Sequence, residues 1–164
     1  MEISRLNQTT FLLGRIDPVL AELMRRIVPS ADPGDSERAK ARLFSSPTDE
    51  VEEEQFFEDW QELVQPELAR LFQSSIEIVE GDLKRMRSNP ATGEATMSIP
   101  SDHLEAWIHG LNQARLVLTE RFQLHEDELD SEPPSASDPR SFMRLQLHMY
   151  ASLQELFLRL LERG

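Results

Sequence analysis

Asp102–Leu124 reads DHLEAWIHGLNQARLVLTERFQL and carries the clearest structural pattern in this chain. Asp102 and Glu105 have the spacing of a capping box, which predicts the start of a helix. Apolar side chains then recur every three or four positions, which places them on one face of an α-helix. The members of this apolar face are Leu104, Trp107, Ile108, Leu111, Leu118 and Phe122. The stretch therefore predicts one long amphipathic helix that packs against the rest of the protein.

A cation lies within that apolar face. At about 100° per residue, Arg115 falls among the apolar side chains, and an unpaired guanidinium against a core is strongly disfavoured. We therefore expect a counter-group, for which two alternatives are open. In the structural one, Arg115 pairs with Glu58 or Glu62 on an acidic helix and holds two helices in register. In the functional one, Arg115 anchors an anion in a pocket, with Asn112 and Glu105 beside it.

Length and composition restrict the class of protein. The chain has 164 residues, of which 39% are hydrophobic, and this suits a single helical domain spanning residues 1–164. It contains no cysteine, so disulfides and thiolate metal sites are excluded. No apolar run approaches the roughly 20 residues that cross a bilayer, and the first residues lack the order of a secretory signal. We expect a cytoplasmic protein with no membrane partner.

Acidic residues are concentrated in two segments. Residues 49–67 hold nine Asp and Glu with no Lys or Arg, and residues 126–138 hold six more. The formal net charge of −13 argues against nucleic-acid binding, which depends on Lys and Arg that neutralise phosphates. The first segment fits either a solvated helix surface or a docking face for a basic partner, in which Glu52, Glu53 and Glu54 take part.

The first part of the chain predicts a small β element followed by helices. Met1–Leu13 favours a short β-hairpin over a helix. Asp17 and Pro18 mark a helix start, with the aspartate as cap and the proline in the first turn, and Pro29 is expected to end this helix. A further short helix is expected over residues 36–44.

The acidic segment predicts a helix that starts at Thr48 or Asp49. This helix is expected to break or kink just before Pro66, because proline lacks an amide donor and clashes with the preceding turn. A second helical stretch then continues to about Arg87. Residues 94–99 form a candidate strand that pairs with the N-terminal one.

The C-terminal region predicts an acidic flexible linker over residues 126–138 and a final helix over residues 139–163. This helix is apolar on two sides, so it lies at the centre of the bundle or is shared with a second copy of the chain. The candidate contact residues for such a homo-oligomer are Met143, Leu147, Tyr150, Phe157 and Leu161. Together the patterns predict a mainly α fold, a bundle of five or six helices with at most a small two- or three-stranded β element from the N-terminus and residues 94–99.

No catalytic or cofactor-binding motif is found in the sequence. It has no glycine-rich phosphate loop, no nucleophile elbow and no His-Glu-x-x-His zinc motif. Glu105 and His109 are four residues apart on one helix, but a single pair supplies too few ligands for a metal. We therefore predict no catalytic residue, no metal site and no cofactor, and we expect that the protein is not an enzyme.

The central helix also carries a spaced set of residues, Trp107, Leu111, Asn112, Arg115, Leu116, Leu118 and Arg121. This set resembles the closing motif of a bacterial domain-of-unknown-function family, DUF2017, with departures at Gln113, Thr119 and Glu120. Residues 17–20 and the acidic residues 53–68 are similar to other parts of the family pattern. Members have no assigned activity, and in some genomes the gene lies near that of a Clp protease adaptor. The resemblance therefore implies a protein-interaction role in regulated, Clp-type proteolysis.

The sequence supports two hypotheses about function. The first is a non-enzymatic protein-interaction module that contacts another protein, such as a basic surface, through its acidic face and its last helix. The alternative is an enzyme or small-ligand carrier with an anion pocket around Arg115, Asn112 and Glu105. A polar cavity beside Arg115 would favour the alternative, whereas a carboxylate partner without a cavity would count against it.

Overall fold

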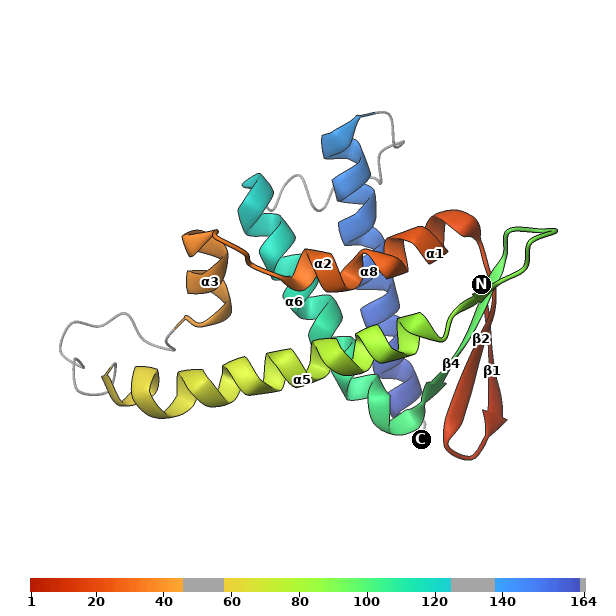
Figure 1. Cartoon of the computed structure of the whole chain (residues 1–164), viewed down its shortest axis with the longest axis horizontal. Coiled ribbons are helices and arrows are strands. Elements are labelled where there is room, and N and C mark those ends of the chain that lie inside the picture. The colour runs from red at the N-terminus through yellow and green to blue at the C-terminus, as the bar shows by residue number, and fades with distance from the viewer. Residues whose placement is uncertain (46–57, 125–137, 163–164) are drawn as a thin grey trace.

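The computed structural model describes residues 1–45, 58–124 and 138–162. Within these residues the chain forms six α-helices and a four-stranded antiparallel sheet, and the sheet lies at one end of the molecule (Figure 1). The helices are α1 (Pro18–Arg25), α2 (Ile27–Ala31), α3 (Glu37–Leu43), α5 (Gln65–Lys84), α6 (Leu104–Phe122) and α8 (Pro139–Glu162). This arrangement confirms a mainly α fold with a small β element. None of the described helices is both long and apolar enough to cross a bilayer.

The sheet joins the N-terminal hairpin to a strand from the middle of the chain. Its strands are β1 (Glu2–Asn7), β2 (Thr10–Ile16), β3 (Arg87–Ser88) and β4 (Ala95–Pro100), in the order β1-β2-β4-β3. The hairpin and its pairing with the 94–99 segment are therefore confirmed. The sheet has four strands rather than two or three because the two-residue β3 folds back on β4 across a turn that contains Gly93, whose φ is +74°.

The connection from the sheet to the first helices follows the sequence prediction only in part. Asp17 caps α1, because its side chain accepts a hydrogen bond from the Leu20 N–H at 2.9 Å. The prediction that Pro29 ends this helix is wrong. α1 ends at Arg25, and Pro29 lies in the first turn of α2, where a backbone N–H has no intrahelical acceptor and its absence costs little. The short helix expected over residues 36–44 is confirmed as α3.

The acidic helix does not break at Pro66. A π-helical turn, Trp60–Val64, precedes α5, and the N–H of Gln65 bonds to the carbonyl of Trp60, five residues back. This wider turn carries the chain past a residue that cannot donate, so the helical path continues directly into α5. The predicted start of the acidic helix lies outside the described residues.

α6 is the central helix, and it contacts α2, α3, α5 and α8. The capping-box prediction is wrong, because α6 begins after a 3-10 turn formed by Ser101–His103 and no side chain caps it. In the core, Trp107 meets Phe157 of α8 edge to face, with ring centroids 5.5 Å apart. The final helix therefore packs against the middle of the molecule.

Candidate binding groove

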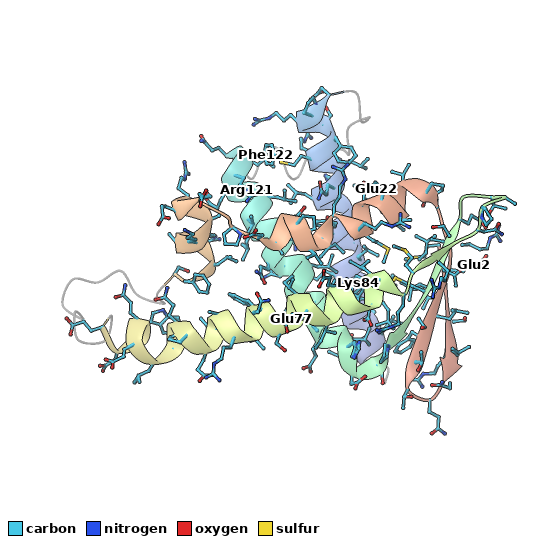
Figure 2. The ribbon with its side chains drawn as sticks, viewed as in Figure 1. Glu2, Glu22, Glu77, Lys84, Arg121 and Phe122 are labelled. Atoms are coloured by element: carbon cyan, nitrogen blue, oxygen red, sulfur yellow. The ribbon has the colours of Figure 1, made fainter. Side chains whose placement is uncertain are left out.

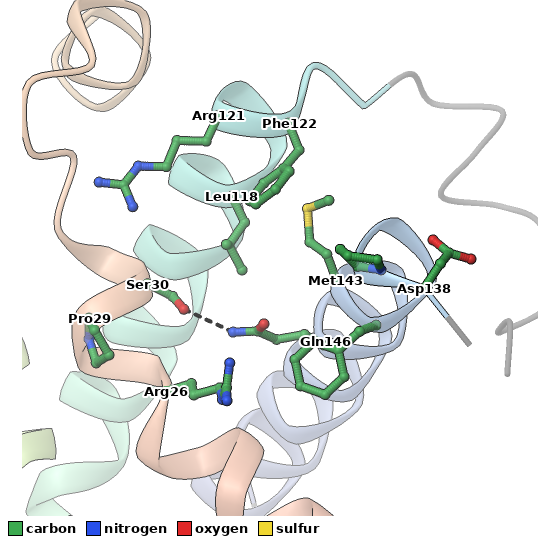
Figure 3. Close-up of a pocket in the computed structure, with 11 residues that line it drawn as sticks. Arg26, Pro29, Ser30, Leu118, Arg121, Phe122, Asp138, Met143 and Gln146 are labelled. Carbon is green, nitrogen blue, oxygen red and sulfur yellow. Dashed lines mark hydrogen bonds between the residues drawn. The ribbon is translucent and has the colours of Figure 1, made fainter. Parts of the chain in front are cut away.

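A groove lies between α2, the C-terminal end of α6 and the N-terminal end of α8 (Figure 3). Its volume is about 570 Å³, which falls within the usual range for binding pockets. The residues that line it are Arg26, Pro29, Ser30, Leu118, Arg121, Phe122, Asp138, Pro139, Phe142, Met143 and Gln146. They are far apart in sequence, and they meet because α6 packs against both α2 and α8.

A chain of buried hydrogen bonds forms the floor of the groove. Gln146 donates from Nε2 to Ser30 Oγ at 2.8 Å and to the Tyr150 hydroxyl at 2.7 Å. The Tyr150 hydroxyl in turn donates to the Leu23 carbonyl at 2.9 Å. Burial raises the pKa of Tyr150 to about 12, so this hydroxyl keeps its proton at neutral pH. These bonds tie α8 to α1 and α2 and thereby set the distance between the groove walls.

Two charged groups at the rim are already engaged within the chain. Arg26 Nε pairs with Glu22 Oε1 at 3.0 Å, and its guanidinium lies 5.1 Å from the centroid of the Phe142 ring. Asp138 accepts hydrogen bonds from two backbone N–H groups in the first turn of α8, at 2.9 and 3.0 Å. The start of the final helix predicted at residue 139 is therefore confirmed.

Arg121 differs from these two groups. Within the part of the chain that the structure describes, its guanidinium has no hydrogen bond and no ion pair. Its Nη2 lies beside the turn at Gly34, where an added Cβ would be only 3.0 Å away. It projects from the end of α6 next to Phe122, which is 45% exposed (Figure 2). The sequence pattern predicts Phe122 in the core, but its ring lies at the surface, whereas Leu124, two residues later, is buried.

Arg115 has a neutral partner instead of the expected carboxylate. Its Nη1 donates to Gln154 Oε1 of α8 at 2.6 Å, and burial lowers the pKa of its guanidinium. The expected pairing with Glu58 or Glu62 is wrong, because both side chains are exposed on the helical segment before α5. Arg115 therefore joins α6 to α8 through an amide.

The hollow beside Arg115 is small, with a volume of about 80 Å³. Its lining residues are Arg115, Leu147, His148 and Ala151. Asn112 and Glu105 are exposed on α6 and do not line it. The structure thus does not bring the three residues of the sequence-based anion site together around a cavity of ligand size.

The buried charge that joins α5 to α6 is a carboxylate. Asp82 is fully buried, its Oδ2 accepts a hydrogen bond from Trp107 Nε1 at 2.8 Å, and both of its oxygens lie 3.0 Å from His103 Nδ1. Arg85, the C-cap residue of α5, also bonds to it. The signal for Asp82 is its place three residues after the buried Val79, on the apolar face of α5. That is the same kind of signal that singles out Arg115.

The Asp82 cluster is built to hold helices together. It contains one carboxylate and one imidazole, and no group of three metal-ligating side chains occurs among the described residues. The donors around the carboxylate come from the C-cap of α5, from α6 and from the 3-10 turn before α6. The cluster therefore fixes where α6 starts relative to α5.

The candidate contact residues on the last helix face mostly inward. Leu161 is 40% exposed, and the other four are buried, namely Met143, Leu147, Tyr150 and Phe157. Within the described chain α8 thus packs centrally, and Leu161 is the member of this set that remains open to a partner. The acidic residues 52–54 lie outside the described residues.

Comparison with known proteins places the chain in a family. A family model described as Domain of unknown function (DUF2017) matches residues 5–161. The chain belongs to the DUF2017 family. No curated protein and no solved structure matches it. The DUF2017 match spans all the residues that line the groove as well as the Asp82 cluster.

Sequence reasoning does not find the groove. Arg26, Phe142 and Gln146 carry no motif, and Arg121 enters only as part of the DUF2017 resemblance. The available signal is the exposed Phe122 beside a cation, and it becomes visible only once the end of α6 is placed against α8.

Proposed function

We propose that this protein is a non-enzymatic protein-interaction module that receives a segment of a partner protein in the groove between α2, α6 and α8. The observation that carries the proposal is an open, mainly apolar groove of about 570 Å³ with the exposed Phe122 at its edge. Aromatic residues beside a concave apolar surface are typical anchors of protein interfaces.

The polar groups of the groove are arranged for binding a partner rather than for catalysis. Ser30, Gln146 and Tyr150 satisfy one another, and the raised pKa of Tyr150 keeps its hydroxyl neutral. The Ser30 hydroxyl accepts a hydrogen bond from the Gln146 amide N–H, and this group cannot take the hydroxyl proton as the imidazole of a Ser–His pair does. These features support docking over catalysis. The alternative, an enzyme or small-ligand carrier that binds an anion at Arg115, has only the hollow of about 80 Å³ in its favour.

A second surface extends the proposal to a basic partner. In the helical segment that leads into α5, Glu58 and Glu62 are exposed next to Leu63, which is 67% exposed, and Leu71 of α5 is 46% exposed. Acidic side chains around apolar ones suit a partner with the opposite charge and a matching apolar strip. We assign to this surface the basic partner expected from the acidic sequence, and to Leu161 any contact with a second copy.

The proposal also includes the cellular setting. The family resemblance supports a cytoplasmic role in regulated, Clp-type proteolysis, in which this module would deliver or restrain a partner. Direct binding to a purified Clp protease adaptor, measured by calorimetry, tests this part. Heat changes equal to those of buffer injections would remove it.

The docking function is tested by affinity capture from the native host. The bait is the full chain, its variant Phe122→Ser, and the matched control Leu6→Ser, in which an exposed apolar side chain of β1, outside the groove, is removed. We expect one or more proteins, identified by mass spectrometry, to be captured by the parent and the control but lost with Phe122→Ser. Equal capture by all three baits would refute docking in the groove.

A further inference from the structure

The charges around the groove do not balance. The Arg26 cation is paired with Glu22, and the Asp138 carboxylate is occupied by the N–H groups of the first turn of α8. Arg121 has no counter-ion among the described residues although it lines the same groove. Among the described residues, the groove therefore offers one guanidinium without a counter-ion, in a chain whose formal net charge is −13.

Arg121 is exposed, and Figure 3 shows its guanidinium on one side of the end of α6 and the Phe122 ring on the other. Phe122, Leu118 and Met143 form an apolar wall of the same groove. A charge-assisted bond between a guanidinium and a carboxylate is stronger than a bond between neutral groups. Its planar fork matches a carboxylate through two parallel N–H···O bonds.

We propose that the segment received by the groove presents a carboxylate side chain to Arg121 and a large apolar side chain to the wall formed by Leu118, Phe122 and Met143. This inference rests on the proposed docking function and names the chemistry of the partner: an acidic and apolar peptide segment of another protein. A single unneutralised cation fits one carboxylate, whereas nucleic acid would require many cations on a protein that is strongly acidic.

The overall charge makes the inference easy to test. A protein of net charge −13 repels acidic peptides at long range, so non-specific selection favours basic ones. The full chain is used to select binders from a random peptide library displayed on phage. The selection should yield acidic peptides only if a local site on the protein binds them. We expect peptides that contain both Asp or Glu and Phe, Leu or Met.

Variants then locate the binding. For a selected acidic peptide, Arg121→Gln should weaken binding about tenfold, because one charge-assisted pair is lost. Arg87→Gln removes the same charge from an exposed position on β3, outside the groove lining, and should change affinity less than about twofold. Replacing the peptide carboxylate by its amide should weaken binding to the parent as much as Arg121→Gln does. Circular dichroism melts check that both variants stay folded.

Three results would overturn the inference. If neutral apolar peptides are selected, and Phe122→Ser weakens them while Arg121→Gln does not, docking survives but the acidic partner is wrong. If no selected peptide is sensitive to Phe122→Ser, the proposed function itself fails. If the chain self-associates with concentration and Arg121→Gln abolishes this in light scattering, the occupant is a second copy instead of another protein.

Discussion

Replacing Asp82 with alanine should destabilise the protein by about 3–5 kcal/mol, the usual cost of breaking a buried charge cluster from one side. The substitution leaves the buried Trp107 N–H without an acceptor, which by itself costs about 1–3 kcal/mol. It also removes the contacts of the carboxylate with His103 and Arg85, whose side chains keep partial access to water and so lose less. For a domain of this size, the change corresponds to a fall in Tm of about 10 °C.

The assay is urea unfolding followed by tryptophan fluorescence and far-ultraviolet circular dichroism. Asp82→Asn retains an oxygen that can accept from Trp107 and should cost less, about 1–3 kcal/mol. The matched control is Glu80→Ala, on the same helix, which removes an exposed ion pair with Lys84 and should cost less than about 1 kcal/mol. If Asp82→Ala costs no more than Glu80→Ala, the reasoning that this carboxylate joins α5 to α6 is refuted.

Two further predictions concern the interior. Tyr150 is the only tyrosine in the chain, so absorbance titration near 295 nm reports on it alone, and its midpoint should lie near pH 12 rather than about 10. Because the pKa of Tyr150 is higher in the folded protein than in the unfolded chain, the contribution of this group to folding stability is fully present below pH 10 and is lost as pH rises from about 10 to 12. A titration midpoint near pH 10 in the protein that is still folded would contradict the burial of Tyr150. The second prediction concerns Arg115→Met, which removes the hydrogen bond to Gln154 together with the cost of burying a guanidinium. The free energy of unfolding in urea should therefore change by less than about 1 kcal/mol. A loss as large as that of Asp82→Ala would show that Arg115 is the main ionic link of the core.

Local features of the fold could be predicted wherever neighbouring residues determine them. Asp17 caps α1, and the hairpin pairs with residues 95–100, because capping and strand pairing follow from short-range chemistry and alternation. The effects of Pro29 and Pro66 on the helices could not be predicted in this way. Pro29 falls in the first turn of a new helix and Pro66 follows a π turn, and in both places the missing N–H costs little.

The site could not be predicted in the same way because it depends on which helices meet. Periodicity identifies a polar residue on an apolar face, and it applies equally to Arg115 and Asp82. It does not say which one becomes fully buried, since that depends on the partner helix and the donors it brings. The groove is still harder to predict from sequence, because its walls come from α2, α6 and α8. Its floor depends on a hydrogen bond between Gln146 and Ser30, which are 116 positions apart.

A double-mutant cycle between Arg121→Gln and the carboxylate-to-amide change in a selected acidic peptide measures the contact on which the binding proposal depends. Isothermal titration calorimetry of the four combinations gives the coupling free energy between the two groups. Paired groups should be coupled by about 1 kcal/mol or more, and the amide peptide should not distinguish Arg121→Gln from the parent. Effects that add to within about 0.5 kcal/mol would show that the guanidinium and the carboxylate do not meet.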